Sequence, residues 1–183
     1  GNDAGGLYGR GAGVALAGGA LASNCAIVAN TQGDTSYNDN SYGAGAYLSG
    51  SSRLIFSTVI GNTAMSYHRI SGGGVYIADA GSSVENCLIM SNSCTPVAVS
   101  DQANQGGAGV NMQGGRLRNC LVVGNSYTAA HAWRLGGGVR MDGGSMENCT
   151  VVRNYNINSN GGVYQGGSAV ITNCIIYFNS GVT

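Results

Sequence analysis

The sequence predicts an all-β fold, a single-stranded, right-handed parallel β-helix of about six coils. A segment built around Asn-Cys recurs six times, with 32, 30, 33, 29 and 25 residues between successive cysteine positions. The segments are short, rich in β-branched residues and bounded by glycine, whereas helical repeats need roughly ten or more residues of 3.6 periodicity. Chain length varies mainly after the closing asparagine of each copy, which is typical of a solenoid with its loops on one side.

Each coil is expected to contain three strands. In the copy at 136–154 the order is strand GVRM, turn DGG, strand SM, turn EN and strand CTVV, followed by the variable loop. Glycine suits the turns because it adopts positive φ without steric cost. The chain 1–183 is expected to be one β-helix domain or a fragment of one, with coils at roughly 11–42, 43–71, 72–106, 107–135, 136–160 and 161–183.

Aligned copies place small apolar side chains in inward columns. One column begins at Val14 and Ala46, a second at Leu16 and Leu48, and a third at Ile27. A further inward column is expected at Cys25, Cys87, Cys120, Cys149 and Cys174, with Ser57 in the cysteine position of the second coil. The asparagines before these cysteines are expected to form a turn ladder of side-chain amides, consisting of Asn24, Asn86, Asn119, Asn148 and Asn173.

The cysteine column is expected to consist mostly of buried thiols. Stacked Cβ atoms would lie about 4.8 Å apart, farther than the roughly 3.8 Å of a disulfide. The sequence has no CxxC and no histidine at matching spacing, so no metal site and no cofactor are predicted. Cys94 is expected in a loop outside the column.

Composition argues against several classes of protein. Eight arginines balance eight acidic residues, lysine is absent, and only 9% of residues are charged. Nucleic acid is therefore not an expected partner, because binding its phosphates needs a basic excess. No apolar run approaches the roughly 18 residues of a membrane span, and we expect any secretion signal to lie outside this chain.

The pairing of glycine-led strands with hydrophobic-x-x-Asn segments, as in GGGV…VVRN and GGGV…IMSN, resembles a known family. It is similar to the GGA(I/L/V) and FxxN repeats of polymorphic outer-membrane proteins and autotransporter passengers. Here Ile or Val stands where that family usually has Phe, and the cysteine column is an addition. The resemblance implies a right-handed β-helix that is secreted or exposed at the cell surface, serves adhesion or scaffolding, and has no identified active site.

The outward positions beside the glycine-led strands form the candidate binding face. Tyrosine rings with amide and guanidinium donors on a flat sheet suit a glycan or a partner protein, although tyrosine is also a common outward strand residue. The candidate ligand-binding residues are Tyr47, Tyr76, Asn111, Arg140, Asp142 and Tyr164, with Arg140 and Asp142 expected on the outside.

No catalytic residue is predicted. Glu85, Arg118 and Glu147 share one position in successive coils, which is typical of an outward charge ladder. His68 and His131 fall in loops of different coils and are not expected to pair. Without lysine or a dense aspartate cluster, a lyase or hydrolase is disfavoured, although arginine serves as the base in some lyases of this fold.

These observations favour a non-enzymatic extracellular or cell-surface β-helix that acts as an adhesin, matrix or filament-building module. A carbohydrate-binding or polysaccharide-cleaving β-helix is the alternative. The chain ends without an evident cap, so we expect either a fragment of a longer protein or head-to-tail self-association through open ends.

Overall fold

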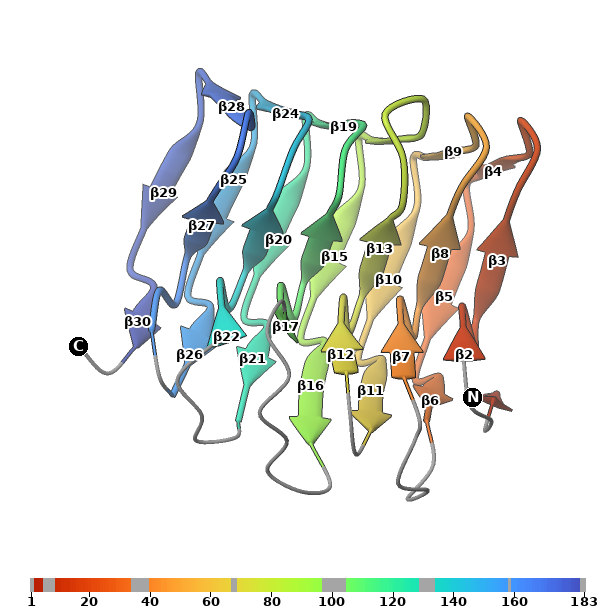
Figure 1. Cartoon of the computed structure of the whole chain (residues 1–183), viewed down its shortest axis with the longest axis horizontal. Helices are drawn as coiled ribbons and strands as arrows, with labels where there is room; N and C mark the ends of the chain where they lie inside the picture. Colours follow the sequence, from red (N-terminus) through yellow and green to blue (C-terminus); the bar gives the residue numbers. More distant parts are fainter. Residues whose placement is uncertain are drawn as a thin grey trace.

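The computed structural model describes residues 2–4, 9–33, 40–66, 69–96, 105–128, 134–157 and 159–181. These residues form a parallel β-solenoid whose coils stack along the long axis (Figure 1). They contain no helix, and therefore none long and apolar enough to cross a membrane.

Five parallel sheets run along the stack, and each is named here by its first strand. The β1 sheet contains β1 (Asp3–Ala4), β6 (Thr31–Gln32), β11 (Thr63–Ser66), β16 (Ser93–Pro96), β21 (Ser126–Tyr127), β26 (Tyr155–Asn156) and β30 (Ser180–Gly181). The β2 sheet contains β2 (Gly9–Arg10), β7 (Asn40–Tyr42), β12 (Arg69–Ser71), β17 (Gln105–Gly106) and β22 (Arg134–Leu135). The β3 sheet contains β3 (Val14–Leu16), β8 (Ala46–Leu48), β13 (Val75–Ile77), β18 (Val110–Met112), β23 (Val139–Met141) and β27 (Val163–Gln165).

The remaining two sheets complete each coil. The β4 sheet contains β4 (Leu21–Ser23), β9 (Arg53–Ile55), β14 (Ser83–Glu85), β19 (Arg116–Arg118), β24 (Ser145–Glu147) and β28 (Val170–Thr172). The β5 sheet contains β5 (Ala26–Val28), β10 (Thr58–Ile60), β15 (Leu88–Met90), β20 (Leu121–Val123), β25 (Thr150–Val152) and β29 (Ile175–Tyr177).

The predicted fold class is correct, and the predicted number of coils is slightly too high. About four turns are complete. In each six-stranded sheet the two outermost strands have a neighbour on one side only. The end coils are therefore only half stacked, which accounts for the difference from the expected six.

The strand register reproduces the inward columns. Val75 pairs with Ala46 on one side and Val110 on the other, and Ile77 pairs with Leu48 and Met112. All of these side chains are fully buried. Stacking equivalent residues directly over one another fills a narrow interior with small and medium apolar groups, so a glycine-rich chain can still bury a core.

Between the β5 strand of one coil and the β3 strand of the next, the described residues form up to two short strands that the sequence analysis placed in the variable loop. They belong to the β1 and β2 sheets and enclose a second core cluster, made of Ala44, Ala64, Ile70, Cys94, Ala108 and Tyr127. The loop assignment of Cys94 is therefore wrong, because Cys94 lies in β16, in register with Ala64 and Tyr127. Strands of two to four residues give too little periodicity to stand out in sequence.

The asparagine that closes each hydrophobic-x-x-Asn segment forms a continuous ladder from Asn30 through Asn62, Asn92, Asn125 and Asn154 to Asn179. In each interior step one amide oxygen accepts two hydrogen bonds from the preceding asparagine. Asn125 Oδ1 accepts from the backbone N–H and from Nδ2 of Asn92, at 2.9 and 3.0 Å. The amide nitrogen also donates to a core carbonyl of the preceding coil, as Asn125 Nδ2 does to Ile89 at 3.0 Å. This ladder satisfies buried polar groups at a tight corner.

The third glycine of the glycine-led strand lies against this ladder. A Cβ on Gly74 would lie 2.9 Å from Asn92 Nδ2 and 2.6 Å from the carbonyl oxygen of Gly109. The same close approach recurs at Gly45 and Gly138. The glycine motif and the closing asparagine are therefore two sides of one contact, which explains why they occur together in each repeat.

The turn before each cysteine has left-handed backbone, with φ near 50° at the preceding residue. An exposed amide ladder joins Asn86, Asn119, Asn148 and Asn173, with donor–acceptor distances of 3.1, 3.3 and 2.7 Å. Phe56 occupies the equivalent position in the second coil, so the ladder does not connect to Asn24. Asparagine tolerates this backbone conformation better than most residues with a side chain.

All six cysteines are thiols. Within the column, the backbone N–H of Cys149 donates to Cys174 Sγ at 3.3 Å, and that of Cys120 donates to Cys149 Sγ at 3.5 Å. Hydrogen bonds with Cys149 and Cys87, together with burial, raise the pKa of the Cys120 thiol well above its ordinary value. The Cys120 thiol, at the centre of these contacts, is therefore protonated at neutral pH.

Candidate ligand-binding face

The outward residues of the β3 sheet lie side by side in the predicted order. Pairing of successive strands aligns Ala15, Tyr47, Tyr76, Asn111, Arg140 and Tyr164. The structure therefore brings five of the six predicted ligand-binding residues into one row, and Asp142 follows at the end of β23. Their environments divide the row into a buried part and an open part.

Arg140 occupies the buried part and is only 2% exposed. Its guanidinium forms a two-point ion pair with Asp142, with both nitrogen–oxygen distances at 2.9 Å. A third bond runs from Nη1 to the carbonyl oxygen of Gln105 at 2.8 Å. Arg140 lies on the outward side of the β3 sheet, but the expectation that it is exposed there is wrong, because the backbone of β17 in the adjoining sheet covers it and accepts from the guanidinium.

Neighbouring polar groups complete this network. Gln113 Nε2 donates to Asn111 Oδ1 at 2.9 Å and to Asp142 Oδ2 at 3.1 Å. Asn111 is fully buried and donates to the carbonyl oxygen of Gly106 at 3.2 Å. The Arg140 guanidinium also lies 5.5 Å from the ring centroid of Tyr164. Arg140 binds Asp142 directly, Gln113 connects Asp142 to Asn111, and bonds to Gln105 and Gly106 join the β3 sheet to the β2 sheet, which is a structural role.

The open part of the row is a pocket of about 270 Å³ lined by Arg10, Tyr42, Tyr47 and Tyr76, called here the tyrosine pocket. The rings of Tyr47 and Tyr76 are parallel within 4°, with centroids 5.6 Å apart. Tyr42 meets Tyr76 edge-on at 5.0 Å, an arrangement favoured by the ring quadrupoles. The Arg10 guanidinium lies over the face of Tyr47, 5.1 Å from its centroid.

The protonation state of the pocket follows from these neighbours. Burial, followed by the nearby phenols of Tyr42 and Tyr47, raises the pKa of Tyr76 above its ordinary value. The Tyr76 phenol is therefore neutral at physiological pH and can both donate and accept a hydrogen bond. Within the described part of the chain, the three hydroxyl groups make no hydrogen bond to protein, so they are open to a ligand.

Sequence reasoning found Tyr47 and Tyr76 but missed Arg10 and Tyr42. Both missed residues end strands of the β2 sheet, directly before the first glycine of a coil, and they pair in register. Gly11 and Gly43 have φ of +63°, and this left-handed corner turns the chain from the β2 sheet into the β3 sheet. The sequence did contain a signal for them, because Arg10 and Tyr42 occupy the same position of the repeat, directly before the first glycine.

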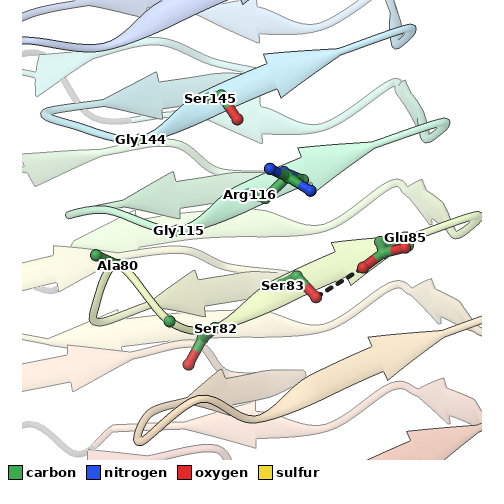
Figure 2. A pocket seen from close by; sticks show the side chains of 9 residues that line it. Ala80, Ser82, Ser83, Glu85, Gly115, Arg116, Gly144 and Ser145 are labelled. Carbon is green, nitrogen blue, oxygen red and sulfur yellow. Dashed lines mark hydrogen bonds between the residues drawn. The ribbon is translucent and has the colours of Figure 1, made fainter.

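A second hollow, called here the polar groove, crosses the turns between the β3 and β4 sheets (Figure 2). Its volume is about 530 Å³, and it is lined by Ala80, Gly81, Ser82, Ser83, Glu85, Gly115, Arg116, Gly144 and Ser145. The turn at residues 78–82 has five residues, whereas those at 113–115 and 142–144 have three. The longer turn stands out from the stack (Figure 1) and forms one wall of the groove, beside the glycine turns of the next two coils (Figure 2).

Asp79 holds this longer turn in place. Its Oδ1 accepts from the backbone N–H of Gly81 and of Ser82, both at 3.0 Å, and its Oδ2 accepts from the backbone N–H of Gly50 in the coil before. Desolvation raises the pKa of Asp79, but these bonds and the bond from the Ser82 hydroxyl outweigh it, so the pKa lies below its ordinary value.

Charged and hydroxyl groups in the polar groove are bound mainly to one another. Ser83 donates to Glu85 at 2.9 Å, and Ser145 donates to Glu147 at 3.0 Å. Arg116 Nε lies 3.6 Å from Glu147, and Arg118 Nε lies 4.0 Å from the same carboxylate. The outward charges of the β4 sheet thus form a ladder of exposed ion pairs, each of which contributes little to stability. The tyrosine pocket is the better candidate site because its polar groups are not already bound to protein.

Two further expectations concern a metal site and the histidine pair. No group of three or more His, Cys, Asp or Glu side chains capable of holding a metal ion occurs in the part of the chain that the structure describes. His68 and His131 lie outside the described residues.

The architecture defines the chain as a parallel β-solenoid. Compared with known proteins, no family model matches the chain, and neither a curated protein nor a solved structure matches it. The resemblance to polymorphic outer-membrane and autotransporter repeats therefore remains a prediction.

Proposed function

We propose that this chain is a non-enzymatic adhesive module of a secreted or cell-surface protein, in which a rigid β-solenoid carries a glycan-binding site. The tyrosine pocket is the observation that supports this proposal. It combines ring faces, phenol hydroxyls and a guanidinium on a sheet that the neighbouring coils hold in register. Ring faces pack against the C–H face of a sugar while hydroxyls and guanidinium bind its polar edge.

The lack of spare acid–base groups in the row supports binding in preference to cleavage. A hydrolase needs two carboxyl groups flanking the scissile bond. Asp142 is the carboxylate of this row, and it accepts bonds from Arg140 and Gln113. No carboxylate lines the tyrosine pocket among the described residues.

A glycan array tests the proposal. The folded chain should retain a subset of glycans, and Tyr47→Ala should lose them because it removes the ring that stacks on Tyr76 and supports Arg10. Tyr177→Ala is the matched control, since Tyr177 is 46% exposed and lies in the β5 sheet, far from the pocket. A blank array, or equal retention by both variants, would contradict the proposal.

A filament-building role is the second candidate, favoured by the C-terminal coil. Ile176 continues an inward column whose members Val59, Ile89, Val122 and Val151 are fully buried, yet it is 44% exposed. Residues 154–183 contain no charged side chain. Natural sheet edges commonly bear charges that prevent edge-to-edge pairing, so this coil suits a further β-coil from a second copy.

Light scattering and negative-stain imaging at rising protein concentration test this second role. Head-to-tail stacking predicts growing rods, and Ile176→Lys should stop growth by placing a charge in the interface. Leu121→Lys is the control, because Leu121 is 40% exposed on the side of the rod. Monomers of the unaltered chain at every concentration would contradict stacking.

A further inference from the structure

We infer that the tyrosine pocket is selective for a sugar ring that carries a carboxylate, such as a hexuronic acid, with the carboxylate bound by Arg10. This inference rests on the proposed glycan-binding function and names its ligand class. It depends on how Arg10 is held, on the charge around it, and on the size of the pocket.

Arg10 is held in a way that leaves its donors available. The guanidinium carbon lies over the ring of Tyr47, 5.1 Å from its centroid, which is a cation–π contact. A guanidinium has five N–H donors, and one ring face does not occupy them all. Arg10 has an exposed side chain and forms no ion pair within the described part of the chain. Its fork of N–H donors matches the two oxygens of a carboxylate.

The charge around the pocket favours an anion. The four lining residues contribute one guanidinium and three phenol rings, and none of them is a carboxylate. Asp142 is the carboxylate whose charge acts on Tyr76. Both of its oxygens accept hydrogen bonds from Arg140, so its negative charge is paired. A net positive site in a partly desolvated hollow attracts an anion and repels a cation.

The same charge argues against the other ligand that three tyrosines could hold. Aromatic cages bind quaternary ammonium groups through their ring faces. Here the Arg10 guanidinium already occupies the face of Tyr47, and a second cation would be repelled at that distance. A neutral sugar could use the rings and hydroxyls, but it would leave the guanidinium without a partner.

Pocket size limits how much of a glycan is held. The volume of about 270 Å³ lies just below the roughly 300 Å³ at which small-molecule sites begin. One ring, or the end of a chain, therefore fills the pocket. The stacked rings of Tyr47 and Tyr76 line the pocket together with the ring of Tyr42, which meets Tyr76 edge-on.

Isothermal titration with matched methyl glycosides tests the inference. Methyl glucuronide and methyl galacturonide differ from methyl glucoside and methyl galactoside chiefly in the carboxylate. The unaltered chain should bind the uronides on the order of tenfold more tightly than the neutral sugars, a preference that added salt should weaken. Arg10→Gln should reduce this ratio to about one. Arg153→Gln, an exposed arginine next to the closing Asn154, should leave the ratio unchanged.

Each outcome bears on a different claim. Equal binding of acidic and neutral sugars, or a preference that survives Arg10→Gln, overturns the inference and leaves glycan binding intact. Binding of N-acetylglycine as tightly as the uronides overturns the sugar requirement. A blank glycan array together with no binding of any methyl glycoside overturns the proposed function and the inference with it.

Discussion

Removing one amide from the buried asparagine ladder should strongly destabilise the solenoid. Asn125→Ala leaves the buried backbone N–H of Asn92 without its acceptor, which costs about 1–3 kcal/mol. It also removes the bonds from Asn125 Nδ2 to Ile89 and to Asn154 Oδ1, each contributing about 1 kcal/mol. The free energy of unfolding should fall by about 3–5 kcal/mol, measured by urea titration with circular dichroism.

The exposed ladder supplies the comparison. Asn119→Gly removes amide bonds to Asn86 and Asn148 but keeps the left-handed backbone, since glycine adopts a φ of 52° without strain. Water replaces the lost partners, so the cost should be under about 1 kcal/mol. If Asn125→Ala destabilised the chain no more than Asn119→Gly, the assigned role of the buried ladder would be wrong.

Gly74→Ala should lower the free energy of unfolding by about 1–3 kcal/mol in urea, because the added methyl would lie 2.6 Å from a carbonyl oxygen of the next coil. Gln32→Met should raise the melting temperature in calorimetry, because both polar atoms of this buried amide lack a hydrogen-bond partner among the residues that the structure describes; a lower temperature would contradict this. Iodoacetamide should label Cys174 in the native chain but Cys120 only after unfolding, because Cys120 is 3% exposed; equal rates by mass spectrometry would count against it. Burial raises the pKa of Asp79, but its hydrogen bonds lower it by more, so the folded-state pKa lies below the ordinary value. The carboxylate should therefore hold its turn fully above about pH 3.9 and release it as the pH falls through the lower folded-state pKa, as followed by NMR.

Repeat alignment predicted the core well because, in a solenoid, equivalent positions of successive copies become stacked neighbours. Aligning Val75 with Ala46 and Val110 in sequence is the same operation as pairing them in a sheet. Alternation along each short strand then assigns its sides. Fold class and inward columns therefore needed no information beyond the sequence.

The candidate site was predicted only in part, because it depends on contacts between sheets. Alternation correctly sent Arg140 and Tyr76 to the outward side of the β3 sheet. Whether that side is covered depends on the β2 sheet, whose strands of two or three residues left no readable period. Arg140 is consequently buried against Gln105, while Tyr76 lines a pocket with Arg10.

The contact between glycine and closing asparagine has a consequence for how such a chain can change in length. Gly74 and Asn92 belong to one coil, and the asparagine bonds to equivalent groups in the coils on both sides. An interior coil therefore makes the same asparagine connections on both sides. Duplicating or deleting one whole interior coil preserves the buried ladder, whereas losing half of one interrupts it. Rod length can then change in steps of about 4.8 Å, which sets how far the tyrosine pocket stands from the C-terminal coil.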